Sequence, residues 1–496
     1  MYTQNKIKIL RKKGKKIGLI HGVFDVIHIG HIWYFKNAKK LVDKLFISVT
    51  SDEYVNKGPG KPIFDIHKRV ELLKSLSFFE EVIISKNETA IDVIKKIKPD
   101  YYIKGQDYKN LKNDLSKKII EEKKAVESFG GKLAFTDTPL YSSSSIINQN
   151  FDFLTENAKN YLQNFKKKEL ANNFKKLITN PSSKKIFIIG DSILDIIKFV
   201  KPSGKSNKNN IIATQFIKQE TNLGGSLLAL NYLSQFFKVI EYLFVGNEND
   251  FKFIKKNLNK NIKIEFIKCE NKLIEKIRYV DEYSLNRLFQ NNKNENQKLE
   301  ADVKNKILKL ISKKTKKVDQ IILFDYGYLY SFKELINLMD KFSKKSVINC
   351  QSNSYNFGFN LANKYTKCHI LSMDEAEFRL IVQNKNFEIK RLIKKNILLF
   401  KKIHTTIITQ GKKGCFLINE NKIIFVPTVI NQSVDSTGSG DVFLATFAML
   451  DLYKNFTVSE MGVISHIIAG IHANELGNRF NLNKSNLKNI VSSVLK

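Results

Sequence analysis

KKIGLIHGVFDVIHIGHIWYF, residues 15–35, places an apolar segment, a glycine-containing turn and the start of a helix in immediate succession. The apolar residues predict a strand that ends at Ile20 or His21, and a helix beginning around Ile29 follows it. Backbone N–H groups at a helix N-terminus bind phosphate well, and Gly22 and Gly30 let the backbone approach a nucleotide closely. The stretch therefore predicts an α/β domain with a phosphate site after its first strand.

Two histidines stand at this predicted helix start, in the sequence His28-Ile29-Gly30-His31. A phosphorus centre undergoing nucleotidyl transfer gains negative charge, which imidazoles stabilise by donating hydrogen bonds. His28 and His31 are therefore the candidate catalytic pair, acting on an α-phosphate and a departing pyrophosphate. The same four residues also occur in class I tRNA ligases, so the motif alone leaves both activities open.

Strands and helices alternate on both sides of this motif. The pattern predicts helices over 29–41, 65–76, 89–97 and 112–128, separated by apolar strands, which is typical of a parallel sheet covered on both faces. A helical linker is expected over 151–183, and a second strand-helix series begins at KKIFIIGDSILD (184–195). We thus expect two doubly wound α/β domains, a Rossmann-like one over 1–150 and a second over 184–496.

A second phosphate site is predicted in VDSTGSGDVFLATFAML, residues 434–450. Gly438, Ser439 and Gly440 precede an apolar helical run, so their backbone N–H groups form a cradle for the charge on a transferred γ-phosphate. Asp441 follows directly and can accept the proton of an attacking hydroxyl. This arrangement predicts phosphoryl transfer, with Asp441 as the general base.

The charge and cysteine content narrow the class of protein. The chain has 83 Lys and Arg against 48 Asp and Glu, but the lysines are scattered among Ile and Asn rather than clustered beside aromatic residues. We therefore expect a solvated basic surface and no nucleic-acid partner. The four cysteines form no CxxC pair, and apolar runs are short, so we expect a cytoplasmic protein without a membrane partner.

The N-terminal part resembles the cytidylyltransferase-like family. GVFDVIHIGHIWYF (22–35) carries the resemblance, which continues through GKPIFDIHKRVELLKSL (60–76), PDYYIKGQDY (99–108) and SSSSII (142–147). Within that family it is most similar to the nucleotidyltransferase domains of bifunctional heptose-phosphate kinases/adenylyltransferases of lipopolysaccharide synthesis. No KMSKS-like loop is found, which makes a tRNA ligase the most distant alternative.

The resemblance implies further nucleotide and phosphate contacts in this part. It makes Asp25 an organiser of the loop, assigns Lys61 and Arg69 to phosphates, and places a helix-capping serine pair before the triphosphate. A surface charge is the alternative for Lys61 and Arg69. TDTPLYSSSS (136–145) lacks the Arg-Thr-Glu-Gly stretch of cytidine-specific members, which favours ATP over CTP. The nucleotide-site residues implied here are Gly22, Phe24, Asp25, Gly30, Lys61, Arg69, Lys104, Gly105, Asp107, Ser143 and Ser144.

The C-terminal part resembles the ribokinase (PfkB) sugar kinases, whose DTxGAGD motif is similar to DSTGSGD (435–441). The resemblance implies sugar contacts from Asp191 and Asp195 in IIGDSILD (188–195) and from the double-glycine turn Gly224-Gly225. It also implies that Gly411 lies at the nucleotide site and that Glu377 organises magnesium-bound water. The chain departs from the family pattern at Leu228 and at INCQSNS (348–354), where the family binds sugar or has Asp-Pro.

Together these patterns predict a bifunctional sugar-activating enzyme whose domain order is the reverse of the family's. The transferase would join ATP, or CTP, to a sugar 1-phosphate and release pyrophosphate, giving a nucleotide sugar like ADP-heptose. The kinase would use ATP and Mg²⁺ to phosphorylate a sugar or sugar phosphate, and a homodimer is expected. The main alternative is an active nucleotidyltransferase joined to a catalytically silent kinase-like module that binds ligand or dimerises.

Overall fold

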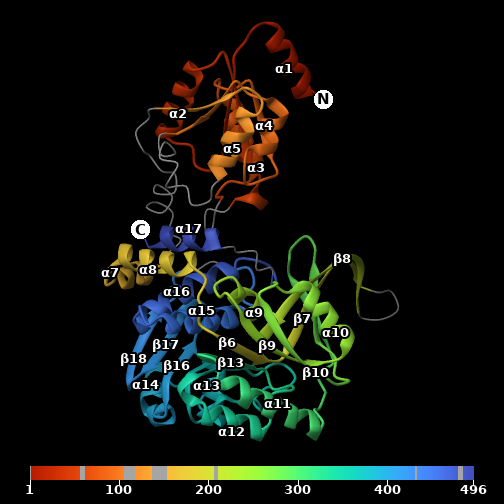
Figure 1. Cartoon of the computed structure of the whole chain (residues 1–496), viewed down its shortest axis with the longest axis vertical. Coiled ribbons are helices and arrows are strands. Elements are labelled where there is room, and N and C mark those ends of the chain that lie inside the picture. Colours follow the sequence, from red (N-terminus) through yellow and green to blue (C-terminus); the bar gives the residue numbers. More distant parts are fainter. Residues whose placement is uncertain are drawn as a thin grey trace. The chain divides into compact units, whose positions relative to one another are not determined.

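The computed structural model divides the chain into two compact units (Figure 1). The first comprises Met1–Phe153 with Ser485–Ser493, and the second comprises Leu154–Lys484 with Val494–Lys496. The sequence interpretation instead places residues 485–493 with the C-terminal domain. The structure describes residues 2–55, 62–105, 118–136, 154–205, 211–430, 433–478 and 484–495. Within these ranges no helix has the length and apolar character needed to cross a membrane.

The first unit is built on a five-stranded sheet in the order β3-β2-β1-β4-β5, and every neighbouring pair is parallel. Strand order reverses at β1, so the carboxyl ends of β1 and β4 form a switch point, which is where ligands bind in open α/β sheets. The strands are β1 (Ile17–Gly22), β2 (Lys44–Thr50), β3 (Glu81–Ser85), β4 (Tyr101–Lys104) and β5 (Lys132–Phe135).

Helices cover both faces of this sheet. Alternate residues of β1 point to opposite faces, so Leu19 packs in the core with α1 and α4, while Ile20 packs with α2. The helices are α1 (Tyr2–Lys12), α2 (Ile29–Lys40), α3 (Ile66–Ser75), α4 (Ile91–Ile97) and α5 (Lys118–Glu127). The expected doubly wound, Rossmann-like arrangement is confirmed. Helix α1 was not predicted, because among its many charged residues only Ile7 and Leu10 are buried apolar side chains.

The second unit contains a nine-stranded sheet in the order β10-β9-β6-β13-β14-β15-β16-β17-β18. The pairs from β10 to β16 are parallel, and β17 and β18 add an antiparallel edge. The strands are β6 (Ile186–Gly190), β9 (Ile240–Gly246), β10 (Ile262–Lys268), β13 (Gln320–Asp325), β14 (Ser346–Cys350), β15 (Cys368–Asp374), β16 (Ile403–Thr409), β17 (Gly414–Asn419) and β18 (Lys422–Pro427).

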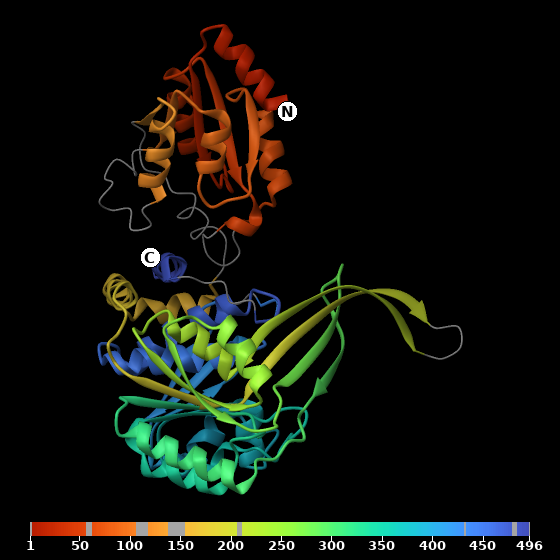
Figure 2. The same cartoon turned by 45° about the vertical axis from the view of Figure 1, so that its right-hand side comes forward.

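A second, four-stranded sheet, which we call the small sheet, has the order β12-β11-β7-β8. Its strands are β7 (Ser192–Lys205), β8 (Ile212–Gly225), β11 (Ile274–Asp281) and β12 (Arg287–Lys293). Figure 2 shows the long pair β7 and β8 extending well beyond the nine-stranded sheet. Because β7 follows β6 after a single residue, the small sheet begins at the carboxyl edge of the large one.

Helices enclose the nine-stranded sheet. One face is covered by α11, α12 and α14, whose apolar side chains share a buried core with the strands. Helix α15 is buried through most of its length and packs against α16 and α9. The helices of the second unit are α7 (Glu156–Gln163), α8 (Lys167–Thr179), α9 (Ser226–Ser234), α10 (Glu248–Asn257), α11 (Ala301–Thr315), α12 (Lys333–Lys341), α13 (Glu375–Ile381), α14 (Ile389–Lys395), α15 (Ser439–Tyr453) and α16 (Val458–His472). Helix α17 (Lys484–Val494) belongs to the first unit over residues 485–493.

The segment expected as a helical linker contains α7 and α8. Both helices belong to the second unit, where α7 packs against β18 and Leu170 and Phe174 of α8 are buried. The apolar spacing that predicted helices there thus marks surfaces that pack onto the second unit.

Candidate active sites

The two histidines of the first unit form a reciprocal cap at the start of α2. His28 is the N-cap residue, and its Nδ1 accepts a hydrogen bond of 3.1 Å from the backbone N–H of Gly30. His31 Nδ1 accepts from the backbone N–H of His28 at 3.3 Å, and the two ring centroids are 4.1 Å apart. The cap therefore holds both imidazoles at the carboxyl end of β1, where the sheet order reverses.

This cap also selects the tautomer of each ring. A neutral imidazole that accepts at Nδ1 carries its proton on Nε2, so His28 and His31 both present Nε2–H as the donor. Burial lowers the pKa of His28, which favours the neutral form further. The pair can thus offer two hydrogen-bond donors to a phosphate.

The ring of Phe24 packs against the ring of His31. Its backbone has a φ of 49°, an uncommon conformation for a side chain of this size, and its buried ring meets the His31 ring edge-on at 5.8 Å. A Cβ on Gly22 would lie 3.0 Å from the Phe24 ring, so glycine is needed there for this packing. Phe24 is therefore part of the core that packs against His31, and its expected place at the nucleotide site stays a prediction.

Asp25 joins the turn after β1 to the segment that precedes α3. Its buried carboxylate accepts hydrogen bonds from the backbone N–H groups of Ile63 at 2.8 Å and Phe64 at 2.9 Å. Because one carboxylate holds two consecutive N–H groups, the position of this segment depends directly on Asp25.

Arg69 is buried inside the first unit, with 1% of its surface exposed. Its guanidinium donates to the carbonyl oxygens of Phe64, Val23 and Thr50 at 2.9, 2.6 and 2.9 Å and pairs with Asp52. The N–H donors of the Arg69 guanidinium therefore point into the protein interior. Arg69 therefore positions the turn after β1 and is not a surface charge, while its expected contact with a phosphate stays a prediction.

Lys104 also faces the interior of the first unit. Its ammonium lies 3.1 Å from the carboxylate of Glu122, and both side chains are largely buried. His21 lies in the same polar cluster, and its Nδ1 is 2.8 Å from the hydroxyl oxygen of Ser48. Burial, followed by the charge of Lys104, lowers the pKa of His21 to about 4. Gly105 follows β4 directly, whereas Lys61, Asp107, Ser143 and Ser144 lie outside the described residues.

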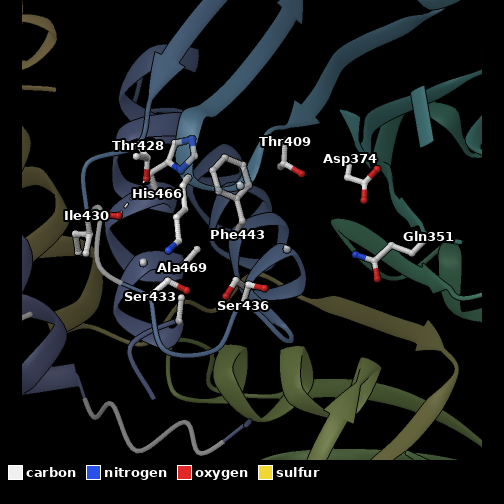
Figure 3. Close-up of a pocket in the computed structure, with 16 residues that line it drawn as sticks. Gln351, Asp374, Thr409, Thr428, Ile430, Ser433, Ser436, Phe443, His466 and Ala469 are labelled. Carbon is white, nitrogen blue, oxygen red and sulfur yellow. Dashed lines mark hydrogen bonds between the residues drawn. The ribbon is translucent and has the colours of Figure 1, made fainter. Parts of the chain in front are cut away.

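The second unit contains a cavity of about 410 Å³ beside the start of α15. Figure 3 shows Asp374 and Gln351 on one side of it and Thr428, Ile430 and His466 on the other, with Phe443 between them. Its lining residues are Gln351, Asp374, Thr409, Gly411, Lys412, Thr428, Ile430, Ser433, Ser436, Ser439, Gly440, Phe443, His466, Ala469, Gly470 and Ala473. Gly411, Ser439 and Gly440, all expected at the nucleotide site, are thus brought to one cavity.

Gly438 is the N-cap of α15 and has a φ of 73°. A Cβ at this position would lie 2.4 Å from Oδ1 of Asn478 and 2.5 Å from a methyl of Leu228, so only glycine fits. Leu228, where the family binds sugar, is therefore buried against this turn. Ser439 N–H donates to the carbonyl oxygen of Ser436 at 3.2 Å, and Ser439 and Gly440 at this helix start line the cavity. The N–H groups of a helix's first turn favour an anion.

Asp441 lies in the first turn of α15 and is 5% exposed. Its Oδ1 accepts a hydrogen bond of 2.8 Å from the side-chain amide of Asn349, in the strand that departs from the family pattern. Burial raises the pKa of Asp441 to about 7, although Tyr326 and Lys276 act in the opposite direction. A carboxylate with such a pKa can accept a proton near neutral pH.

Asp191 follows β6 and is fully buried. Its carboxylate accepts from the backbone N–H groups of Leu329 at 2.8 Å, Tyr326 at 3.0 Å and Tyr328 at 3.4 Å. Burial, followed by the neighbouring Asp325 carboxylate, raises the pKa of Asp191 to about 7. Asp191 therefore holds the loop after β13, and its expected contact with a sugar stays a prediction.

Asp195 on β7 forms a buried ion pair with Arg278 of β11. Its second oxygen accepts from the side-chain amide of Asn478. A Cβ on Gly224 would lie 2.2 Å from that oxygen, so the glycine turn at the end of β8 leaves room for the carboxylate. Gly225 has a φ of 57° and begins α9.

The side chain of Glu377 also points into the protein interior. Its two oxygens accept from the backbone N–H groups of Ser352 and Asp374, each at 2.7 Å, and Asp374 caps α13 in return. Burial, followed by the nearby Asp374 carboxylate, raises the pKa of Glu377. These contacts fix the position of the Glu377 carboxylate, and its expected role as an organiser of magnesium-bound water stays a prediction; Asp374 lines the cavity. Across the described residues no cluster of three His, Cys, Asp or Glu side chains is arranged for a metal ion.

Several cavity residues were not anticipated from the sequence. His466 and Phe443 meet edge-to-face with centroids 4.9 Å apart, and Thr428 lies beside them in Figure 3. His466 lies in the apolar run VISHIIAGIH of α16, where its position among apolar residues was the only available signal. Burial lowers its pKa to about 4, so the ring is neutral.

Comparison with known proteins divides the chain in the same way. Residues 19–149 match the cytidylyltransferase-like family model, and residues 184–470 match the model of the pfkB family carbohydrate kinases. Over 127 residues the chain is 39% identical to the Bifunctional protein HldE of a Nitratiruptor species, covering 25% of this chain and 27% of that protein. Over 133 residues it is 30% identical to the protein of the same name from Syntrophotalea carbinolica, covering 26% of each.

The chain thus spans about a quarter of the length of these relatives. The matched segments give the order of the two domains in this chain and in no relative. The expectation that this order is reversed relative to the family is therefore not upheld. Among solved structures, phosphofructokinase-2 from Escherichia coli in complex with potassium aligns with a TM-score of 0.50 and 13% identity, over 64% of this chain and 100% of that chain. This similarity concerns the fold only, which is ribokinase-like in the second unit. Because the pfkB model spans more than half of the sequence, the chain belongs to the pfkB family of carbohydrate kinases.

Proposed function

We propose that the chain is a bifunctional enzyme that combines a sugar kinase with a nucleotidyltransferase. One observation, common to both units, carries this proposal. In each unit, side chains or backbone N–H groups suited to phosphate binding lie at the N-terminus of a helix, α2 in the first unit and α15 in the second. In the first unit these groups are His28 and His31, and in the second they are Gly438 to Gly440 with Asp441.

In the proposed transferase reaction, an oxygen of a sugar 1-phosphate attacks the α-phosphorus of ATP, and the bond to pyrophosphate breaks. The Nε2–H groups of His28 and His31 donate to the oxygens that gain charge in this step. The product is a nucleotide sugar of the ADP-heptose kind, which would serve lipopolysaccharide assembly. The match to the HldE proteins over the first unit supports this substrate class, with CTP as the alternative nucleotide.

In the proposed kinase reaction, ATP occupies the cavity beside α15, and the acceptor is a sugar or sugar phosphate. Asp441 takes the proton of the acceptor hydroxyl, while the N–H group of Gly440 at the start of α15 donates to the transferred phosphate. Asp374 in the cavity lining would offer a carboxylate oxygen to Mg²⁺ accompanying ATP, and that cation would supply positive charge to offset the phosphates. The hydrogen bond from Asn349 holds the Asp441 carboxylate in a defined orientation, as a working base requires.

The experiment that tests both activities uses the purified full-length protein. One assay supplies ATP or CTP with a panel of sugar 1-phosphates and measures pyrophosphate; the other supplies ATP with sugars and sugar phosphates and measures ADP. Asp441→Asn should abolish only the second activity and His31→Ala only the first. If wild type and Asp441→Asn consume the same trace of ATP across the panel, the kinase half is a silent binding module.

A homodimer in the cytoplasm completes the proposal. Sedimentation velocity of the purified chain tests the dimer directly, and a single species at the monomer mass of 57.3 kDa would contradict it.

A further inference from the structure

Two cations of the small sheet face the same side of strand β11. Lys276 and Arg278 are two residues apart, so their side chains leave the strand on one face. In the pairing of β11 with β7, Lys276 lies opposite Asp195. The two cations and this carboxylate therefore form one polar group on the small sheet.

The charge of Arg278 is compensated within the protein. Its guanidinium pairs with Asp195, and 8% and 4% of the two side chains are exposed. The second oxygen of Asp195 accepts from the amide of Asn478, and Oδ1 of Asn478 lies against Gly438. Contacts thus run from the face that carries Lys276 and Arg278 to the glycine turn at the start of α15.

Lys276 has no such compensation. It is half-buried and forms no ion pair within 4 Å with any residue that the structure describes. Burial lowers the pKa of its ammonium, while the carboxylates of Asp195 and Asp441 raise it. Desolvating a cation without a counterion is unfavourable, so a bound anion would stabilise Lys276 in this place.

Tyr326 connects Lys276 with the proposed base. The ammonium lies 6.0 Å from the centroid of the Tyr326 ring. The Tyr326 hydroxyl is buried, and Asp441 is close enough to raise the pKa of this phenol, after burial itself. Lys276 and Asp441 therefore approach the same side chain, beside the helix start that would hold the γ-phosphate.

We propose that Lys276 is a catalytic residue of the kinase half whose ammonium contacts the phosphoryl group during its transfer. The inference rests on the proposed kinase function. In the step, a bond forms between the acceptor oxygen and the γ-phosphorus, and the bond to the bridging oxygen of ADP breaks. The hydroxyl proton passes to Asp441, the bonding electrons leave with ADP, and Lys276 keeps its proton. Its charge offsets the negative charge on the equatorial oxygens of the moving group.

Binding of a transition-state mimic tests this role without knowledge of the acceptor. Calorimetry would compare MgADP alone with MgADP plus aluminium tetrafluoride, which resembles the phosphoryl group in transfer. Lys276→Met and Lys276→Gln should weaken the fluoride complex about 10- to 100-fold relative to wild type, because they remove a charge that acts on the transferring group. The affinity for MgADP alone should stay unchanged, which also shows that the variants are folded.

Two further variants complete the design. Lys276→Arg should recover part of the lost affinity because it keeps the charge. Lys293→Met is the matched control, since Lys293 lies on β12 of the same sheet, is exposed, and pairs with Glu275 at 3.3 Å; it should bind as wild type does.

Equal affinities of wild type and Lys276→Met for the fluoride complex would overturn the proposal. So would a loss of turnover that appears only in the KM of phosphorylated acceptors, because Lys276 would then recognise the acceptor. If the wild type binds MgADP but not the fluoride complex, Lys276 has no such role while the nucleotide site stands. If it binds no MgADP, the proposed kinase function fails together with this inference.

Discussion

The side-chain amide of Asn349 donates a hydrogen bond of 2.8 Å to the carboxylate of Asp441. Asn349 is a buried residue of β14, the central strand of the nine-stranded sheet, and this strand places its side chain beside the proposed base. The donor stabilises the ionised carboxylate and fixes its orientation.

Asn349→Ala should therefore lower the kinase kcat by about tenfold, the loss expected for one hydrogen bond to a charged group. Removing the donor should also move the acidic limb of the pH–rate profile to higher pH, because the amide lowers the pKa of Asp441. Asn257→Ala, on exposed helix α10, is the control. An unshifted profile in Asn349→Ala would contradict this role.

The pH profile of the kinase should follow the ionisation of Asp441. Burial raises its pKa to about 7, so the carboxylate is protonated and inactive as a base below that pH. Activity should rise about tenfold per pH unit up to pH 7 and level off above it. Initial rates between pH 5.5 and 8.5 check this. A flat profile, or Asp441→Asn with more than about 1% of the wild-type rate, would exclude Asp441 as the base.

His31→Ala should reduce nucleotidyl transfer by about 10²- to 10³-fold, because it removes a donor to developing charge. Kinase activity should persist, and stability should fall by only about 1 kcal/mol through loss of the helix cap. The single tryptophan, Trp33, lies on α2 and reports unfolding of the first unit by fluorescence. His67→Ala, exposed on α3, is the matched control; near-normal pyrophosphate release by His31→Ala would remove His31 from the mechanism.

Arg69→Lys should destabilise the first unit by about 3 kcal/mol, because the guanidinium contacts to three carbonyls and Asp52 are lost in a buried place. Urea unfolding followed by Trp33 fluorescence measures this. Lys68→Met, an exposed neighbour, should leave stability within about 0.5 kcal/mol. A raised KM for ATP without loss of stability would restore Arg69 to phosphate binding.

His21 should make the first unit less stable in acid. Its pKa is about 4 in the folded state and 6.5 as a free side chain, so between these values only the unfolded chain takes up the proton. The stabilisation is complete above pH 6.5 and falls by about 3 kcal/mol as pH drops to 4. The free energies of unfolding of wild type and His21→Asn, followed by Trp33 fluorescence, should converge as the pH falls. A constant difference between the two proteins across this pH range would contradict the lowered pKa of His21.

The order of strands and helices in the first unit could be predicted from the sequence, because apolar periodicity and turn residues are local properties. The positions of His28 and His31 at the start of α2 follow from the same local pattern. The glycine turn and Asp441 at the start of α15 were likewise predictable, since a helix start needs only a few consecutive residues. Helix α1 was missed because its two buried apolar residues, Ile7 and Leu10, give too weak a periodic signal.

The sequence by itself thus determined the two α/β units and the helix starts that we propose for phosphate chemistry. Only the tertiary structure decided how the charged residues are paired inside the protein. Arg69, Asp191 and Glu377 bind backbone groups, because each is buried by segments distant in sequence and must satisfy its charge inside the protein. His466 lines the cavity, and Lys276 is close enough to Asp441 to lower its pKa, for a similar reason. Burial and proximity depend on how strands and helices distant in sequence pack together, and no local sequence pattern encodes that packing.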